Sequence, residues 1–155
     1  RSKDISYRIK TFGDELIAFV ANLSEDDWGQ VCDEEQWSVG VTARHIAGHM
    51  SIIDMAGAIV KGEDLPAMTM DQIVETANQH AREHADCTKS EVVELLQKNS
   101  AETVDFYAGL DDADLDRKGS MPAFGGEVTT EQVAEFVILM SAAQHLDSMK
   151  AAVAG

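Results

Sequence analysis

Apolar residues recur at every third or fourth position along much of this chain, which is the spacing of one face of an α-helix. The first such pattern covers residues 4–22, and its apolar positions are Ile5, Ile9, Phe12, Leu16, Phe19 and Val20. A second pattern begins after Ser38, a candidate N-cap, and continues to about Lys61, where Gly62 ends it. We therefore predict a first helix over residues 4–22 and a second, continuous helix over residues 38–61.

The second half of the chain carries two further helical regions. One pattern covers residues 69–86, and a capping box from Thr88 to Glu91 restarts it as far as about Phe106. This pattern is typical of either one kinked helix or two helices in succession. Residues 111–128 are first acidic and then glycine-bearing, which predicts a long ordered loop of a kind that is often functional. The last helix begins with the capping sequence at residues 129–132 and continues to the C-terminus.

These helices predict an all-α fold, because amphipathic helices of this length cannot bury their apolar faces separately. We expect a four-helix bundle with long connections between helices one and two and between helices three and four. The chain has 155 residues, close to the commonest size of one domain, which favours a single domain over residues 1–155. Methionines at helical spacing are expected to fill the core: Met50, Met55, Met140 and Met149.

The formal net charge of −16 excludes several classes of partner. A phosphate backbone or an anionic membrane would repel such a chain, so we expect neither nucleic-acid nor membrane binding. The uninterrupted apolar stretches fall far short of the ~20 residues that a membrane span needs. Cys32 and Cys87 stand in no metal-binding spacing, and the chain opens with no apolar signal-peptide core. Free thiols in a reducing compartment are therefore expected, which favours a cytoplasmic location.

Histidines are the candidate chemical groups, and all five lie in predicted helices. His45 and His49 are four residues apart, as are His80 and His84, and this spacing stacks two imidazoles on one helix face, where they can chelate a cation. Three histidine ligands with an open position can polarise a carbonyl or lower the pKa of bound water. His80 and His84 lie among charged residues and are expected at the surface. The Glu-x-x-His pattern of iron-carboxylate bundles does not occur.

The sharpest local signal is the sequence EQWSV at residues 35–39, followed by RHIA at residues 44–47. It indicates a tryptophan that closes the entry to a helix whose second turn places a histidine on the core face. In this the chain resembles the DinB-like superfamily, which includes mycothiol-dependent isomerases and bacillithiol transferases. The order and spacing of further short motifs extend the resemblance from about Ser6 to the C-terminus. In the family a Trp-Ser pair precedes the second helix, and a histidine about eight residues after the tryptophan is the first metal ligand, which implies that role for His45.

The family takes its other two ligands from the last helix, four residues apart, as His-x-x-x-His or Glu-x-x-x-His. The corresponding run here is SAAQH at residues 141–145. His145 matches the second of these ligands, whereas Ser141 stands in the place of the first and is a poor ligand for a divalent ion at neutral pH. Three alternatives follow: His49 supplies the third ligand, Ser141 holds a water or substrate group in a two-histidine site, or the metal has been lost and the pocket binds something neutral.

The resemblance implies a metal-dependent enzyme similar to the DinB-like thiol S-transferases and isomerases. A divalent metal ion, zinc or nickel, would be held by His45, His49 and His145 between the helices, and Ser141 would orient the nucleophile as a catalytic residue. The expected partners are a small-molecule substrate, such as a low-molecular-weight thiol, and a second copy of the chain in a homodimer. The alternative, from another class, is a metal-free non-catalytic bundle that binds a small hydrophobic ligand or a protein partner.

Overall fold

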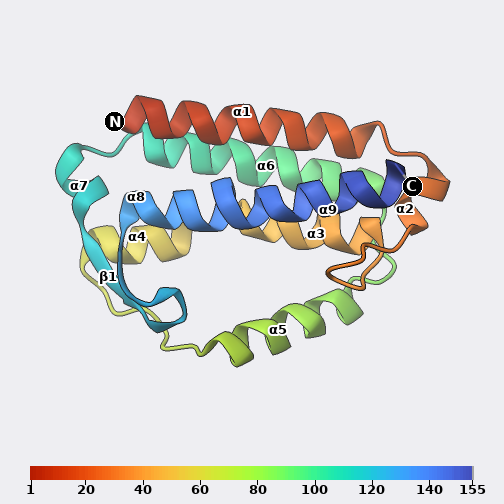
Figure 1. The fold of residues 1–155 in the computed structure, drawn as a ribbon. Coiled ribbons are helices and arrows are strands. Elements are labelled where there is room, and N and C mark those ends of the chain that lie inside the picture. The colour runs from red at the N-terminus through yellow and green to blue at the C-terminus, as the bar shows by residue number, and fades with distance from the viewer. Residues whose placement is uncertain (155) are drawn as a thin grey trace.

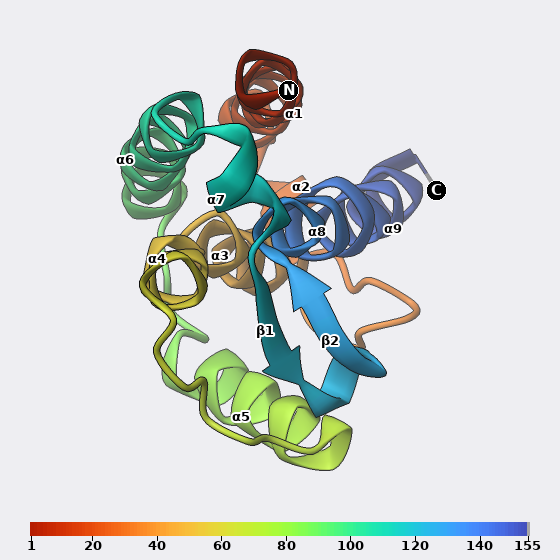
Figure 2. The same cartoon turned by 90° about the vertical axis from the view of Figure 1, so that its left-hand side faces the viewer.

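Long helices form the framework of the computed structural model, which describes residues 1–154 (Figure 1). Four rods lie side by side in the bundle: α1 (Ser2–Ala21), the α3–α4 segment (Val39–His49 and Ile53–Lys61), α6 (Lys89–Ala108) and the C-terminal helix, which comprises α8 (Thr130–Val133), η2 (Ala134–Ala142) and α9 (Ala143–Ala154). α5 (Met70–Glu83) lies outside them (Figure 2). The all-α prediction of a four-helix bundle with long first and third connections is confirmed. Within residues 1–154, no helix has both the length and the apolar character needed to cross a membrane.

Side-chain caps confirm the predicted helix starts at Ser38, Thr69, Thr88 and Thr129 and mark a further start at Ser24. Each cap residue accepts a hydrogen bond from the backbone N–H three positions further on: Ser24, Ser38, Thr69, Thr88 and Thr129. The first opens the short α2 (Glu25–Gly29). The fourth separates α5 from α6, so the third region is two helices in succession. Such caps satisfy backbone donors that have no partner within the helix, which is why local sequence locates them well.

The α1–α6 interface forms one side of the core. Buried apolar side chains run the length of α1, among them Ile9, Leu16 and Val20. Gly13 of α1 faces Ser100 of α6 so closely that a Cβ at this position would collide with the Ser100 hydroxyl. Glycine therefore allows the two helices to approach each other at their middle.

The second helix is not continuous, and the prediction of one helix over residues 38–61 is wrong at residues 50–52. The backbone carbonyl groups released at the break find partners on α6. Asn99 donates its side-chain amide to the Ala47 carbonyl at 2.8 Å, and the Thr103 hydroxyl donates to the Met50 carbonyl. Both side chains are buried, so the break is stabilised by polar groups that its own sequence does not contain.

The predicted loop at residues 111–128 is ordered but contains regular structure. A short helix, α7 (Asp112–Asp116), leads into an antiparallel hairpin of β1 (Lys118–Met121) and β2 (Gly126–Thr129). A 3-10 turn, η1 (Pro122–Phe124), forms the tip of the hairpin. The hairpin extends from the end of the bundle towards α5 (Figure 2). It therefore forms a wall beside the bundle rather than a fifth rod within it.

The C-terminal helix is widened in its middle, because η2 is a π-helix. A π-helix bonds each residue to the fifth one along and so spaces the inward positions more widely than an α-helix does. The buried positions are accordingly four apart, at Ala134, Ile138 and Ala142. The prediction that Met140 fills the core is wrong, since this side chain is 53% exposed. Met50 and Met149 are fully buried as predicted, and Met55 is half-buried.

Candidate metal centre

Three half-buried histidines meet between α3 and α9. His45 and His49 come from successive turns of α3, and His145 comes from the first turn of α9. One ring nitrogen of each lies within 4.8 Å of the corresponding nitrogens of the other two. Zn–N bonds are about 2.0–2.1 Å long, so nitrogens at this spacing lie close to the reach of a single ion. The structure thus places three histidines for a metal site.

Local helix structure sets the orientation of these rings. The Ser38 cap starts α3. Because His45 and His49 are four residues apart within this helix, they lie on the same face one turn apart, and their ring centroids are separated by 4.3 Å. Trp37 packs edge-on against His45 at 5.0 Å between centroids, while His145 approaches His45 from α9 at 5.0 Å. The tryptophan therefore helps to hold the first histidine in place as the other helix brings in the third.

Burial keeps the cluster uncharged at neutral pH. Loss of hydration, together with repulsion from the neighbouring His145, lowers the pKa of His45 to about 4. Burial, and then repulsion from His45 and His145, lowers the pKa of His49 to about 3. The pKa of His145 is also lowered by burial, against an opposing effect of Glu35. Neutral imidazoles have the free lone pairs that metal binding requires.

Glu35 adds a buried carboxylate to the site. Its side chain is 5% exposed, and Oε1 lies 3.7 Å from Nδ1 of His145. Within residues 1–154, the other oxygen, Oε2, is buried without a hydrogen-bond partner, and so is Nδ1 of His49. Buried polar atoms are costly unless they are paired, so both atoms indicate that the site is built for a cation or a polar ligand.

The position of Glu35 depends on a tight turn before α3. The Gln36 N–H donates to the Cys32 carbonyl and the Cys32 N–H to the Trp37 carbonyl, both at 2.8 Å. Gln36 has a positive φ of 58°, which reverses the chain direction there. The preceding acids Asp33 and Glu34 are exposed. Sequence reasoning missed Glu35 as a site residue, because composition does not distinguish it from its acidic neighbours and only the turn buries it.

Comparison with known proteins agrees with this architecture. The family model described as the DinB superfamily matches residues 8–146. This chain belongs to the DinB superfamily. Among the solved structures, YfiT from Bacillus subtilis, a probable metal-dependent hydrolase with an unusual four-helix bundle topology, superposes with a TM-score of 0.76 at 15% sequence identity, covering 97% of this chain and 84% of that one. No match was found among the curated proteins.

Ser141 is the point at which this DinB chain departs from the pattern that the resemblance implied. It lies within η2, one turn before His145, and is half-buried. Among residues 1–154 its hydroxyl makes no hydrogen bond. Of the three alternatives, the geometry matches the first, because His49 joins His45 and His145. The role of Ser141 as a catalytic residue stays a prediction.

The second histidine pair lies at the C-terminal end of α5, where His80 is in the last turn and His84 is the C-cap residue. His80 is exposed as predicted, whereas His84 is half-buried, and their ring centroids are 6.2 Å apart. Both line a cavity of about 40 Å³ that His45 also borders. A proton on His80 would also repel one on His45, which contributes to the lowered pKa of His45. Any test of metal binding must therefore separate this pair from the central three.

Proposed function

We propose that this chain is a metal-dependent enzyme in which His45, His49 and His145 hold one divalent ion. The observation that carries the proposal is the convergence of three uncharged, half-buried imidazoles beside two buried polar atoms without partners. Zinc and nickel both suit imidazole ligands. The family and the fold of YfiT support the same class of chemistry.

Each residue has a distinct task in this proposal. The histidines bind as neutral donors, and a divalent ion held by them would supply Lewis-acid activation and lower the pKa of a water or thiol group. Glu35, whose Oε1 lies 3.7 Å from Nδ1 of His145, would favour a proton on that nitrogen and so leave the other nitrogen free to bind the ion. Ser141 would orient the nucleophile from the neighbouring turn. The reaction is a hydrolysis or a transfer to a thiol, according to which nucleophile is used.

Elemental analysis of protein purified without a histidine tag or chelator tests the proposal. We expect about one divalent ion per chain, as for a single set of three histidine ligands, and loss of that ion in His145→Ala. The matched control is His80→Ala with His84→Ala, which removes an equal chelating pair from α5 and should leave the ion in place. Retention of metal by His145→Ala, or its loss from the α5 control, would overturn the assignment.

A metal-free binding module is the second candidate, and the serine at position 141 is the observation that favours it. In that case the parent protein stays metal-free even after dialysis against zinc or nickel. Replacement of His45 or His145 would then change the free energy of unfolding without changing any metal content. The same set of proteins therefore separates the two functions.

A further inference from the structure

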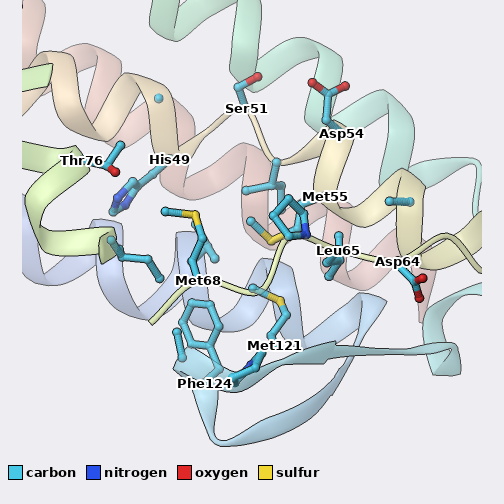
Figure 3. Close-up of a pocket in the computed structure, with 18 residues that line it drawn as sticks. His49, Ser51, Asp54, Met55, Asp64, Leu65, Met68, Thr76, Met121 and Phe124 are labelled. Carbon is cyan, nitrogen blue, oxygen red and sulfur yellow. The ribbon is translucent and has the colours of Figure 1, made fainter. Parts of the chain in front are cut away.

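An apolar cavity of about 520 Å³ adjoins the histidine cluster, and His49 is part of its wall. The rest of the wall is formed by Gly48 of α3, the break before α4, α4 itself, the loop before α5, α5, the tip of the hairpin and one residue of η2. Figure 3 shows His49 at one end of this cavity and Asp64 at the other, with Met55, Met68 and Met121 between them. Ligand pockets in proteins commonly enclose about 300–1,000 Å³, so the volume suits a small molecule.

We propose that this cavity is the substrate pocket of the metal centre, and that it accepts a small, apolar, uncharged molecule whose reacting group lies near His49. The inference rests on the proposed function, because it takes His49 as a metal ligand. His49 is the residue common to both features: it belongs to the histidine cluster and it lines the cavity. A molecule in the cavity therefore lies beside His49, next to the metal site.

The lining determines the chemical class of this molecule. Leucine, isoleucine, phenylalanine and methionine side chains dominate it, and methionine adapts its shape to different apolar ligands. The acidic groups at its margin are Asp54 and Asp64, both exposed. Together with a net charge of −16, they disfavour an anionic substrate such as a dicarboxylate. A polar, low-molecular-weight thiol does not suit this pocket either, so a thiol nucleophile would approach from another side.

The pocket depends on elements that lie outside the four rods of the bundle. Every residue of α5 is at least partly exposed, yet Ile73 and Thr76 turn towards the cavity. From the other side the hairpin contributes Met121 and Phe124. If these side chains had only a structural role, we would expect them to fill the space between α5 and the hairpin as a packed core. Their arrangement around an open volume is what indicates a ligand.

Two fluorescent probes with the same aromatic skeleton test the proposal in metal-free protein. N-phenylnaphthylamine is neutral, and anilinonaphthalene sulfonate adds one negative charge. We expect the neutral probe to bind with enhanced emission, and the sulfonate to bind at least about tenfold more weakly, because a buried charge without a partner is costly. Equal binding of the two probes, or no binding of the neutral one, would overturn the proposal.

A matched pair of variants locates the probe. Met68 lines the cavity, whereas Met70, two residues further on, is 52% exposed and lies outside it. We expect Met68→Glu to weaken binding of N-phenylnaphthylamine at least about tenfold by placing a carboxylate in the pocket, and Met70→Glu to leave it unchanged. An equal effect of the two substitutions would show that the probe binds elsewhere.

Addition of Ni²⁺ then separates this inference from the proposed function. Nickel held at the three histidines lies close enough to quench the emission of the bound probe, so we expect quenching in the parent and none in His145→Ala. If metal binds but the neutral probe does not, the pocket is refuted and the metal centre stands. If the probe binds but no metal does, the proposed function fails and so does the claim that the pocket serves it. If both bind without quenching, the pocket is not at the metal centre.

Discussion

The α1–α6 side of the bundle and the α3–α9 side use the same kind of amphipathic helix, yet they bury different chemistry. Along α1 the inward positions are apolar and fully enclosed, as at Ile9 and Leu16. Between α3 and α9 the inward positions include three histidines, and a buried glutamate lies beside them. Every buried side chain stabilises the α1–α6 side, whereas on the α3–α9 side the desolvation of buried polar groups opposes part of that stabilisation.

The contrast extends to backbone regularity. α1 and α6 are uninterrupted over 20 residues each. On the other side α3 ends at His49, immediately before the break, and His145 follows directly on a π-helical segment. Irregular helix geometry is frequent at functional sites, since it redirects side chains that a regular helix would leave on another face. We infer that the α1–α6 side contributes most of the free energy of folding, and that this contribution offsets the cost of the buried polar groups at the site.

The largest expected effect is from Leu16→Ala, which empties a fully buried position of α1. We expect the free energy of unfolding of the metal-free protein to fall by about 2–5 kcal/mol, from lost apolar burial and the cavity left behind. Urea denaturation measures this change. Metal stoichiometry of the folded fraction should stay as in the parent, because none of the three histidines lies on α1. Loss of the metal would show that the two sides are not separable.

How far sequence predicts this protein depends on the range of the interactions involved. Capping at Thr88 and Thr129 joins residues three apart, so it was recognisable, as was the periodic apolar face of α1. The break after His49 depends on Asn99 and Thr103, more than fifty residues further along the chain. Neither partner carries a local signal. Long-range polar contacts of this kind account for the error in the second helix.

The candidate site shows the same division. The four-residue spacing of His45 and His49 and the family motif leading to His145 placed all three histidines in one hypothesis, and the structure brings them together. Glu35 was missed because a turn, not a periodic pattern, buries it. The cavity was missed as well, since it depends on how α5 and the hairpin at residues 118–129 lie against the bundle.

Lowering the pH should also distinguish the two sides of the bundle, because the buried histidines of the α3–α9 side lower the free energy of unfolding in acid. An unfolded histidine binds a proton near pH 6.5, whereas His49 in the folded chain has its pKa lowered to about 3. Between these values the unfolded state binds the additional proton, so the stability present above pH 6.5 is lost as the pH falls. At pH 5 this costs about 2 kcal/mol for one such histidine.

His49→Gln tests this directly. Relative to the parent, the metal-free variant should lose about 2 kcal/mol less unfolding free energy between pH 8 and pH 5. Chemical denaturation at the two pH values, with a chelator present, measures the difference. Parallel losses in the two proteins would mean that His49 is hydrated and titrates normally.

Glu35→Gln is expected to move metal affinity and stability in opposite directions. Loss of the carboxylate beside His145 should weaken zinc binding at least about tenfold, or about 1.4 kcal/mol, as for other groups that orient a metal ligand. The metal-free protein should become more stable, because a buried carboxylate with one oxygen lacking a hydrogen-bond partner is replaced by an uncharged amide. Calorimetric titration with zinc and urea denaturation measure the two effects. Asp33→Asn, at an exposed position two residues earlier, is the control and should change neither.

The smallest expected change in the free energy of unfolding is from a glycine-to-alanine substitution on the α3–α9 side. A Cβ at Gly48 of α3 would meet nothing within 4 Å, so Gly48→Ala should stabilise the protein by up to about 1 kcal/mol through helix propensity. The identical substitution at Gly13 of α1 would collide with Ser100, and should cost at least about 1 kcal/mol. Thermal and urea denaturation of both variants compare the two sides with the same added methyl group. Ser100→Ala should recover part of the loss in Gly13→Ala and leave Gly48→Ala unaffected. If both alanine variants were destabilised, the open space beside the exposed Gly48 would not be real, and the contrast between a close contact at Gly13 and free space on the histidine side would fail.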